Sequence, residues 1–391
     1  MRAPSTDETL SCSTLSPTAL PTAFDRPTVA KISLSALSHN FREARRRAMG
    51  RKILAVVKAQ AYGHGAVAVS RHLLGLGADM LGVALIEEGK ELRKAGIDAR
   101  ILVMGALFPE QAEAIVRLDL IPVVFDMALV RALSKAARSL NKKIPMHVKI
   151  DTGMGRIGLA PEQAMEFIEE VRKIDNVIVE GLMTHFADAD LKDKNFATGQ
   201  MERFETLIKA LEAQGTDLPL RHAANSAALL DFNRAFFTMV RPGLMLYGYN
   251  PLEEAGEVDL QPALSLVTRI AFIKRLPTGM PVSYGRTFIT KRESLIATIP
   301  IGYADGYSRG LSNKGEAIVR GVKVPIAGRV CMDMTMLDVT DVPEAREGDE
   351  VMLIGTQGNE RITADDIASK TGTISYEVLC GISGRVPRVY V

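Results

Sequence analysis

The sequence is short of cysteine, of net charge and of long apolar runs near its start. Cys12, Cys331 and Cys380 are too few and too scattered for a disulfide framework or a metal site, which is typical of a reducing compartment. The 48 basic and 46 acidic residues are interspersed, which argues against nucleic acid or a membrane surface as partner. Residues 1–26 are rich in Ser, Thr and Pro and lack the apolar core of a secretory signal or membrane helix. We expect a flexible tail there and a cytoplasmic protein.

The alternation of short apolar runs with helical patterns predicts a barrel. From about residue 30, short apolar runs alternate with helical patterns such as 161–173 and 198–214, which indicates βαβ units and a parallel sheet. Eight runs follow an opening strand at 29–34, as in a (β/α)8 TIM-type barrel. A doubly wound sheet would also alternate, but no GxGxxG follows the first strand. The expected barrel strands are Ile53–Lys58, Met80–Leu85, Ile101–Leu107, Ile121–Phe125, Pro145–Ile150, Val177–His185, Arg221–Asn225 and Met239–Tyr247.

The pattern changes near residue 250. From there on, short β-like runs are separated by turn signals, with one helix expected at 363–369. We therefore expect a tail at 1–26, a barrel at 27–258 and a mostly β domain at 259–391. The expected β runs are Leu264–Lys274, Glu293–Ile301, Gly315–Gly328, Met334–Val339, Glu350–Ile354 and Val386–Val391.

Residues 53–65 carry the strongest signal for function. Five apolar residues run into Lys58, and a polar stretch with two glycines follows at 60–65. A lysine at the end of such a strand lies where α/β barrels place their chemistry, and a hydrated ammonium there needs a partner or must be held uncharged. On the strand alone, a lysine that merely snorkels out of the barrel mouth remains the stronger alternative.

The residues that follow this lysine resemble the sequence motif of a known family. Lys58-Ala59 followed by Ala61-Tyr62-Gly63-His64-Gly65 resembles the pyridoxal phosphate (PLP) lysine motif of bacterial alanine racemases, which are PLP enzymes of fold type III. Gln60 stands where that family usually has Asn. The resemblance spans roughly residues 28–391. It implies a barrel followed by a β domain, PLP held as a Schiff base on Lys58, Tyr62 near the cofactor, and a homodimer with shared active sites.

A glycine-rich loop follows the fifth expected barrel strand. Three glycines within residues 153–158 let the backbone approach a ligand closely and deliver Arg156 near the barrel mouth, although a solvated arginine is an equal alternative. By resemblance, Arg156 contacts the phenolic oxygen of the cofactor and the substrate carboxylate, and a planar two-pronged donor suits a carboxylate. The lysine at the position of Lys149 is carbamylated in many family members and holds that arginine.

Two further strand ends carry basic residues. His185 ends the sixth run, where a lone histidine is more often a satisfied core residue. By resemblance it supports the catalytic tyrosine and an arginine. Arg241 lies in the eighth run and, in the family, faces the pyridine nitrogen. Because a guanidinium cannot hand its proton to the ring, the ring remains a weaker electron sink, which favours racemisation over transamination.

The seventh and eighth runs together predict a phosphate site. Asn225 and Ser226 precede a short helix, where Ser226 either caps the helix or seats a phosphate. Gly243 and Leu244 offer backbone amides at the neighbouring strand end, and barrels commonly bind phosphate after strands seven and eight. The resemblance adds Tyr376 as a phosphate ligand.

Racemisation requires bases on both faces of Cα. The resemblance gives Lys58 one face and Tyr284 the other, with Tyr284 contributed across the dimer interface, although a tyrosine before glycine is more often simple turn packing. In the family, Met332 touches the substrate through its backbone.

We therefore expect PLP-dependent interconversion of L- and D-alanine, which supplies D-alanine for peptidoglycan. The alternatives are a broad-specificity or other amino-acid racemase, a PLP-dependent decarboxylase of basic amino acids, and a non-catalytic PLP-binding homeostasis protein. The last resembles the barrel alone, so the β domain argues against it.

Overall fold

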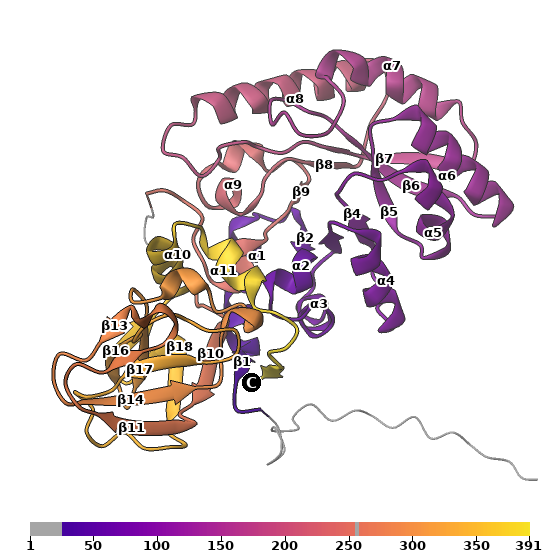
Figure 1. The fold of residues 1–391 in the computed structure, drawn as a ribbon. Coiled ribbons are helices and arrows are strands. Elements are labelled where there is room, and N and C mark those ends of the chain that lie inside the picture. The colour runs from indigo at the N-terminus through magenta and orange to yellow at the C-terminus, as the bar shows by residue number, and fades with distance from the viewer. Residues whose placement is uncertain (1–25, 255–257) are drawn as a thin grey trace, which may run out of the picture.

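The computed structural model describes residues 26–254 and 258–391, and Figure 1 shows a barrel half beside a β-rich half. The flexible tail expected at 1–26 therefore lies outside the described residues except for Arg26. The expected domain boundary at 258/259 stays a prediction, because residues 255–257 beside it are not described.

Eight parallel strands form the barrel, so the predicted fold class is confirmed. Neighbours in the sheet follow the order β8-β7-β6-β5-β4-β3-β2-β9. The remaining gap, between β8 and β9, is bridged by backbone bonds from Thr238 to Arg221 (3.0 Å) and from Arg241 to Ala224 (2.9 Å). The strands are β2 (Lys52–Val56), β3 (Met80–Val83), β4 (Ile101–Val103), β5 (Ile121–Val124), β6 (Ile144–Lys149), β7 (Val177–Met183), β8 (Leu220–His222) and β9 (Met239–Val240).

Helices follow the strands and cover the outside of the barrel (Figure 1). One of them, α6, was missing from our prediction although its signals are present: Asp126 caps it by accepting from the Ala128 amide at 2.7 Å, and Leu129, Val130 and Leu133 recur on its buried face. The helices of this half are α1 (Leu34–Arg47), α2 (Lys58–Tyr62), α3 (Ala66–Gly75), α4 (Ile86–Lys94), α5 (Ala112–Arg117), α6 (Met127–Ser139), α7 (Pro161–Arg172), α8 (Asn195–Ala213) and α9 (Ser226–Asp231).

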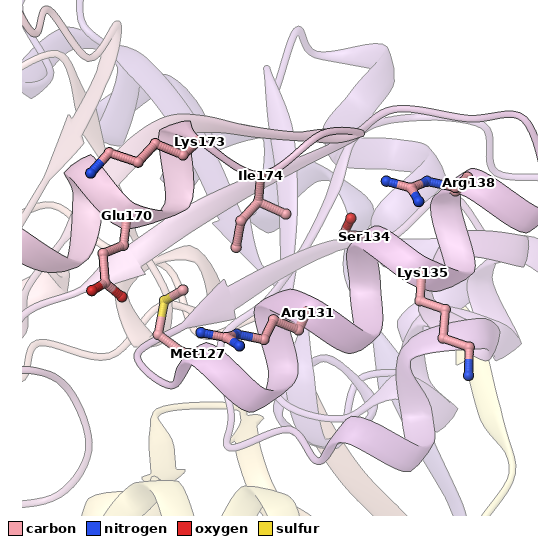
Figure 2. Close-up of a pocket in the computed structure, with 8 residues that line it drawn as sticks. All are labelled: Met127, Arg131, Ser134, Lys135, Arg138, Glu170, Lys173 and Ile174. Carbon is pink, nitrogen blue, oxygen red and sulfur yellow. The ribbon is translucent and has the colours of Figure 1, made fainter.

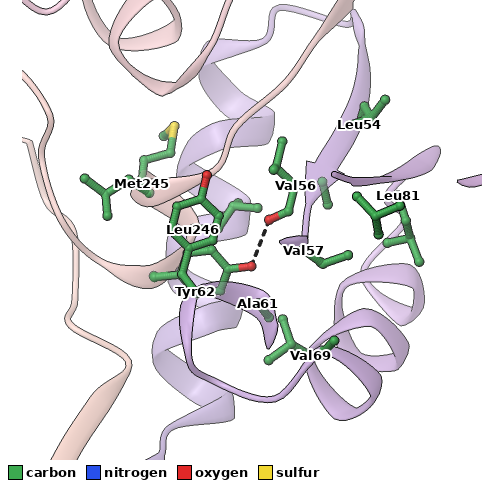
Figure 3. Close-up of a cluster of buried hydrophobic side chains, with 14 of the residues drawn as sticks. Leu54, Val56, Val57, Ala61, Tyr62, Val69, Leu81, Met245 and Leu246 are labelled. Atoms are coloured by element: carbon green, nitrogen blue, oxygen red, sulfur yellow. Dashed lines mark hydrogen bonds between the residues drawn. The ribbon is translucent and has the colours of Figure 1, made fainter. Parts of the chain in front are cut away.

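The barrel core explains the continuous apolar runs. Residues of β3, β4 and β5 are buried throughout, as expected for parallel strands covered on both faces. Figure 3 shows the part around Tyr62, whose ring stacks on that of Tyr247 at 4.8 Å between centroids. The Tyr247 hydroxyl donates to the Val56 carbonyl at 2.8 Å. The end of β2, just before Lys58, is thus anchored by packing and by this bond.

Two strand ends differ from our expectation. β2 ends at Val56, so Lys58 lies two residues beyond the strand, in the turn at its C-terminal end. The run expected as strand 239–247 stops at Val240 and continues as a 3-10 turn, Leu244–Tyr247. Pro242 offers no amide to a sheet, which explains the break.

The C-terminal half is mostly β, as predicted. A seven-stranded sheet has the order β16-β15-β18-β10-β1-β20 with β19 on β18, beside the sheet β11-β14-β17 and the hairpin β12-β13. Its strands are β10 (Leu264–Arg269), β11 (Phe272–Leu276), β12 (Pro281–Val282), β13 (Phe288–Ile289), β14 (Ser294–Ile299), β15 (Glu316–Val319), β16 (Val322–Pro325), β17 (Thr335–Asp338), β18 (Glu350–Gln357), β19 (Glu360–Ile362) and β20 (Arg388–Tyr390).

Two expected runs in this half are in fact pairs of strands. Run 264–274 divides into β10 and β11, which join different sheets. Run 315–328 is a hairpin whose turn residues Arg320 and Gly321 both have positive φ, 51° and 77°. The expected helix at 363–369 is confirmed as α10 (Ala364–Thr371), and a second helix, α11 (Ser375–Gly381), packs against α2 (Figure 1).

The first strand joins the far half of the chain. β1 (Val29–Ile32) pairs antiparallel with β10 and parallel with β20. It therefore belongs to the C-terminal sheet although the whole barrel follows it in sequence. No helix in the described part of the chain is both long and apolar enough to cross a membrane.

Candidate active site

Two cavities of similar size lie in the barrel half, and they differ in character. One, of about 560 Å³, lies on the outside between α6 and α7 and is lined by Arg131, Lys135, Arg138, Lys173 and Glu170 among others. Figure 2 shows the amines of Lys135 and Lys173 pointing away from each other. These charged side chains are exposed, so this is a solvated groove whose cations do not converge.

The other cavity, of about 460 Å³, opens at the C-terminal ends of the barrel strands. All ten residues predicted to bind the cofactor line it, together with Lys149. Its lining has four basic side chains, of which Arg156 and Arg241 are guanidinium cations, and no carboxylate. Such a pocket favours an anionic occupant. Lining residues are Val56, Lys58, Tyr62, Ala84, Met104, Gly105, Ala106, Lys149, Arg156, Ile157, Met183, His185, Asn225, Ser226, Arg241, Gly243, Leu244 and Tyr376.

Lys58 opens a turn of left-handed backbone. Residues 59–62 have φ of 51°, 55°, 52° and 54°, a conformation that costs L-residues roughly 1–2 kcal/mol each. Contacts with α4 hold it: the Ala59 amide donates to Glu88 at 2.6 Å, and the Gln60 amide nitrogen donates to Glu91 at 2.6 Å. Strain of this kind, fixed by its surroundings, is typical of functional sites.

Burial and neighbouring charge weaken the basicity of the two pocket lysines. Burial first, and then the Arg156 cation, lower the pKa of Lys58. Burial, Arg241 and Arg156 hold the pKa of Lys149 well below its usual range. The Lys149 side chain is almost fully buried, with no hydrogen-bond or ion-pair partner among the described residues. Its amine is therefore favoured in the neutral, nucleophilic form.

The Arg156 loop is wound around one carboxylate. Asp151 accepts from the amides of Gly153 (2.9 Å), Gly155 (3.1 Å) and Arg156 (3.0 Å). Burial opposes ionisation of Asp151, but these amide bonds bring its pKa below the ordinary value. Gly158 is needed on the return, because its φ is 129° and a Cβ there would lie 2.8 Å from the Asp151 nitrogen. The loop thus has a defined shape that places Arg156 on the pocket wall.

Arg241 is buried at the pocket floor and its terminal nitrogens are all bonded to neutral acceptors. One donates to His222 at 2.9 Å, and the other to the carbonyls of Thr184 (2.8 Å) and Ala223 (2.9 Å) and to His185 Nδ1 (3.2 Å). Since His185 Nδ1 accepts, its proton lies on Nε2. Burial, followed by Arg241 and the pocket lysines, keeps the pKa of His185 well below normal.

The predicted phosphate end is formed by α9 and the turn after β9. Asn225, rather than Ser226, caps α9 by accepting from Ala228 at 3.0 Å. Ser226 Oγ instead accepts from the amides of Gly243 (2.8 Å) and Met245 (3.3 Å), so the Gly243 amide is already engaged.

Glycine at position 243 also makes room for a tyrosine. A Cβ at Gly243 would lie 2.6 Å from the Tyr62 hydroxyl, so only glycine allows this approach. Burial raises the pKa of Tyr62 above its ordinary value and that of Tyr376 to about 12, so both phenols keep their protons and remain donors.

The structure does not bring Tyr284 and Met332 to this pocket. Neither lines it, and both lie on the β-rich half with 70% and 52% of their surface exposed. Tyr284 opens a short turn (Tyr284–Arg286) preceded by Ser283 at φ 66°, and Ser283 is tied to the Arg329 carbonyl at 2.6 Å. The tyrosine therefore projects from a fixed turn with its ring in solvent.

Sequence analysis missed the wall that Met104, Gly105 and Ala106 form after β4. The sequence clue to this wall was the glycine after the strand. In the structure a Cβ at Gly105 would lie 2.3 Å from the Ala84 carbonyl oxygen, so no larger residue fits there. It also missed His222, which is fully buried beneath Arg241.

Comparison with known families matches nearly the whole described chain. Residues 32–251 match the alanine racemase N-terminal domain, and residues 263–390 match the alanine racemase C-terminal domain. Among curated relatives, the alanine racemase of Halothermothrix orenii is 48% identical over 93% of this chain and 97% of its own length. Alanine racemase 2 of Caldanaerobacter subterraneus subsp. tengcongensis is 50% identical over 94% and 95%.

Solved structures show the same likeness. The alanine racemase of Clostridium difficile 630 superposes with a TM-score of 0.91 at 37% identity, covering 94% of this chain and 96% of that chain. The Bacillus anthracis alanine racemase with bound L-Ala-P gives 0.89 at 38% identity, covering 95% and 96%. With both family domains matched and relatives of this identity, the chain belongs to the alanine racemases, isomerases that interconvert the enantiomers of alanine.

Proposed function

We propose that this enzyme racemises alanine with pyridoxal phosphate and two bases, Lys58 and the Tyr284 of a second copy. The observation that carries the proposal is the pocket at the barrel mouth, which has four basic side chains and no carboxylate. PLP brings a phosphate and alanine brings a carboxylate, so the pair supplies the negative charge that this lining lacks.

The residues present fit this cofactor. Lys58 would hold its aldehyde and Arg241 its ring nitrogen. The Ser226 hydroxyl, the Leu244 amide and Tyr376 would hold its phosphate, with Gly243 leaving room beside it because it has no side chain. Tyr62, His185 and Asn225 would line the cofactor, and Arg156 would bind the substrate carboxylate with Met332 of the second copy beside it. PLP, when bound, supplies an electron sink that makes the Cα–H bond of alanine acidic.

The two bases act on opposite faces of Cα. Burial and the Arg156 cation lower the pKa of Lys58, which favours the neutral amine that a base must present. Its position is fixed by the left-handed turn and by Glu88 on α4. Tyr284 would remove or return the proton on the other face. One base removes the proton from one face of Cα, and the second group, in its protonated form, returns a proton to the opposite face. Both groups are therefore required for racemisation.

A homodimer follows from the separation of these groups. The β-rich half exposes Phe272 (53%), Ile289 (55%) and Met334 (52%) besides Tyr284, and the barrel mouth exposes Phe108 (63%). Large apolar side chains exposed on both halves favour association. A two-fold interface would place the Tyr284 turn of each copy over the pocket of the other.

The proposed product, D-alanine, indicates a cellular role. We infer that the enzyme supplies D-alanine for cell-wall peptidoglycan and works in the cytoplasm. Cys331 and Cys380, the two described cysteines, are both unpaired, in keeping with a reducing compartment.

The test is Cα hydrogen exchange in D2O, started separately from L- and D-alanine and followed by chiral analysis. Deuterium gained with inversion from both enantiomers would establish a two-base racemase. A panel of other amino acids then distinguishes an alanine-specific enzyme from a broad-specificity racemase. Binding of PLP without exchange from any amino acid would overturn the proposal in favour of a non-catalytic PLP protein.

We also propose that Lys149 is carbamylated. Its neutral amine would attack CO2 and release one proton, which leaves a carbamate anion beside the guanidinium cations of Arg241 and Arg156. An intact-mass or 13C NMR measurement after incubation with 13C-bicarbonate reads this directly. Unmodified Lys149 would remove the assignment without affecting the two-base proposal.

A further inference from the structure

A line of side-chain hydrogen bonds leaves the pocket floor and runs down through the barrel interior. The Arg241 guanidinium donates to His222 Nδ1 at 2.9 Å, and the other ring nitrogen, His222 Nε2, lies 2.7 Å from His147 Nδ1. His147 Nε2 lies 3.1 Å from Glu180, which forms an ion pair with Arg100 at the surface. Both histidines are fully buried, and β8, β6 and β7 each contribute one member of the line.

The proton positions along this line follow from the donor at its top. A guanidinium can only donate, so His222 Nδ1 accepts and its proton lies on Nε2. That proton points to His147 Nδ1, so His147 carries its own proton on Nε2 and donates it to the Glu180 carboxylate. Only one arrangement of protons satisfies every member, because both ends of the line are charged groups of fixed role.

The barrel is shaped locally to admit this line. The register between β6 and β7 shifts between Met146 and His147, which brings His147 opposite Gly181. A Cβ at Gly181 would lie 2.7 Å from the His147 ring, so only glycine leaves space for it. An irregular pairing next to an obligatory glycine indicates a built position for the ring rather than incidental core packing.

The line of hydrogen bonds connects Arg241, a buried cation, to a negative charge. Arg241 is 3% exposed and has no carboxylate partner among the described residues. The other basic side chains of the pocket, Lys58, Lys149 and Arg156, offer it no negative charge. Burial alone lowers the pKa of Arg241 to about 9. A buried unpaired charge is costly, and polarised hydrogen bonds lessen the cost when they end on an opposite charge.

Glu180 can supply that opposite charge. Although its partial burial opposes ionisation, the bonds from His147 and Arg100 lower its pKa below the ordinary value. Burial keeps the pKa of His147 low and that of His222 well below normal, so both rings stay neutral and transmit the polarity of the line instead of taking up a proton.

We propose that Glu180 is a positioning residue: through His147 and His222 in fixed tautomers, its carboxylate orients Arg241 and keeps it charged. The assignment rests on the proposed function only in that Arg241 would hold the ring nitrogen of PLP. The line of hydrogen bonds itself lies within this chain and can be measured with or without the cofactor.

The decisive variant is Glu180→Gln, because an amide keeps the shape but can either accept or donate, which removes both the charge and the direction of the line. The matched control is Glu170→Gln, an exposed carboxylate at the α6–α7 groove. Glu180→Asp keeps the charge on a shorter side chain and serves as the conservative rescue.

The first readout is 15N NMR of histidine side chains in the purified enzyme, where only six histidines contribute. We expect the rings of His147 and His222, like that of His185, to be locked as the Nε2–H tautomer from pH 6 to pH 9 in the native enzyme and in Glu170→Gln. Loss of the locked pattern is expected in Glu180→Gln. Native rings in mixed tautomers, or an unchanged pattern in Glu180→Gln, would overturn the proposal.

The second readout separates positioning from general stability. In Glu180→Gln we expect kcat to fall about tenfold with KM for alanine changed less than twofold, and the pH transition of the bound-cofactor absorbance to shift to lower pH. Glu180→Asp should recover part of the loss. Equal kcat in the Asp and Gln variants would contradict a role of the charge. If native enzyme showed no PLP binding or exchange, the proposed function would fail while the tautomer result still decided the fate of the hydrogen-bonded line.

Discussion

The two proposed bases stand in opposite settings. Lys58 lies inside a walled pocket, on strained backbone held by α4, and burial lowers its pKa. Tyr284 is 70% exposed on a turn of the β-rich half, and nothing from its own chain's pocket reaches it. One chain therefore encloses Lys58 and the proposed cofactor site, but holds Tyr284 away from them.

The largest effect is expected from Lys58→Ala. Loss of a positioned base costs roughly 10²–10⁴-fold in rate, and here the cofactor attachment is lost as well, so turnover from either enantiomer should fall below detection. Absorbance of bound cofactor and a coupled D-alanine assay measure the two losses. Activity within tenfold of native would refute the assignment.

Tyr284→Phe should be nearly as severe but one-sided. Removal of the proton from L-alanine should slow by about 100-fold or more, while exchange starting from D-alanine, in which Lys58 acts, should suffer less. Cofactor binding should be unchanged because the pocket does not include this residue. Deuterium exchange from each enantiomer provides the measurement, and equal losses from both would contradict one base per face.

Mixing the two inactive variants tests the contrast itself. In a dimer of one Lys58→Ala and one Tyr284→Phe chain, one site regains both bases and the other has neither. Random exchange of subunits makes about half of the dimers mixed, so roughly a quarter of native activity should return. Each variant refolded alone is the control. No recovery on mixing would mean that the bases do not come from different chains.

A smaller effect is expected from acid, confined to the barrel half. All six histidines lie there, and burial lowers the pKa of His64 to about 4 and those of His147, His185 and His222 below normal. In the unfolded chain these four histidines take up protons near pH 6.5, whereas in the folded barrel they stay neutral to lower pH. The free energy of unfolding should therefore fall as pH drops from 6.5 towards 4, by about 1.4 kcal/mol per pH unit for each histidine.

Hydrogen exchange of the cofactor-free protein, resolved by peptide, measures this effect. Protection of β2–β9 should decline with acid before that of β10–β18. Equal decline in both halves would show that histidine burial is not the cause.

Smallest of all should be the effect of Gln60→Asn. Asn adopts positive φ more readily than Gln, but its shorter side chain loses the bond to Glu91. With these terms opposed, stability should change by less than about 1 kcal/mol, as measured by denaturant unfolding. A larger loss would identify the Glu91 contact as essential to the lysine turn.

The contrast between the halves also marks what sequence could predict. Local rhythm predicted the barrel strands, and because parallel strands finish at one edge, the strand ends indicated a site at Lys58 and a phosphate seat near Ser226 and Gly243. The cofactor roles of the other pocket residues, among them Tyr376 outside the barrel, came from the resemblance to the alanine racemases. Ala59 and Ala61 could not be placed, since alanine favours the right-handed helix and packing against α4 imposes the opposite hand. Glu180 was missed because a strand's inward side chains reveal their partners only once strands are paired.

The placement of β1 has a consequence for how the protein is made. This strand is among the first segments synthesised, yet its partners β10 and β20 lie at residues 264–269 and 388–390. At the ordinary pace of translation, roughly 5–20 residues per second, the strand waits on the order of 20–70 s for its last partner. The barrel can close in the meantime, so β1 pairs first with β10 on one side and only much later with β20 on the other.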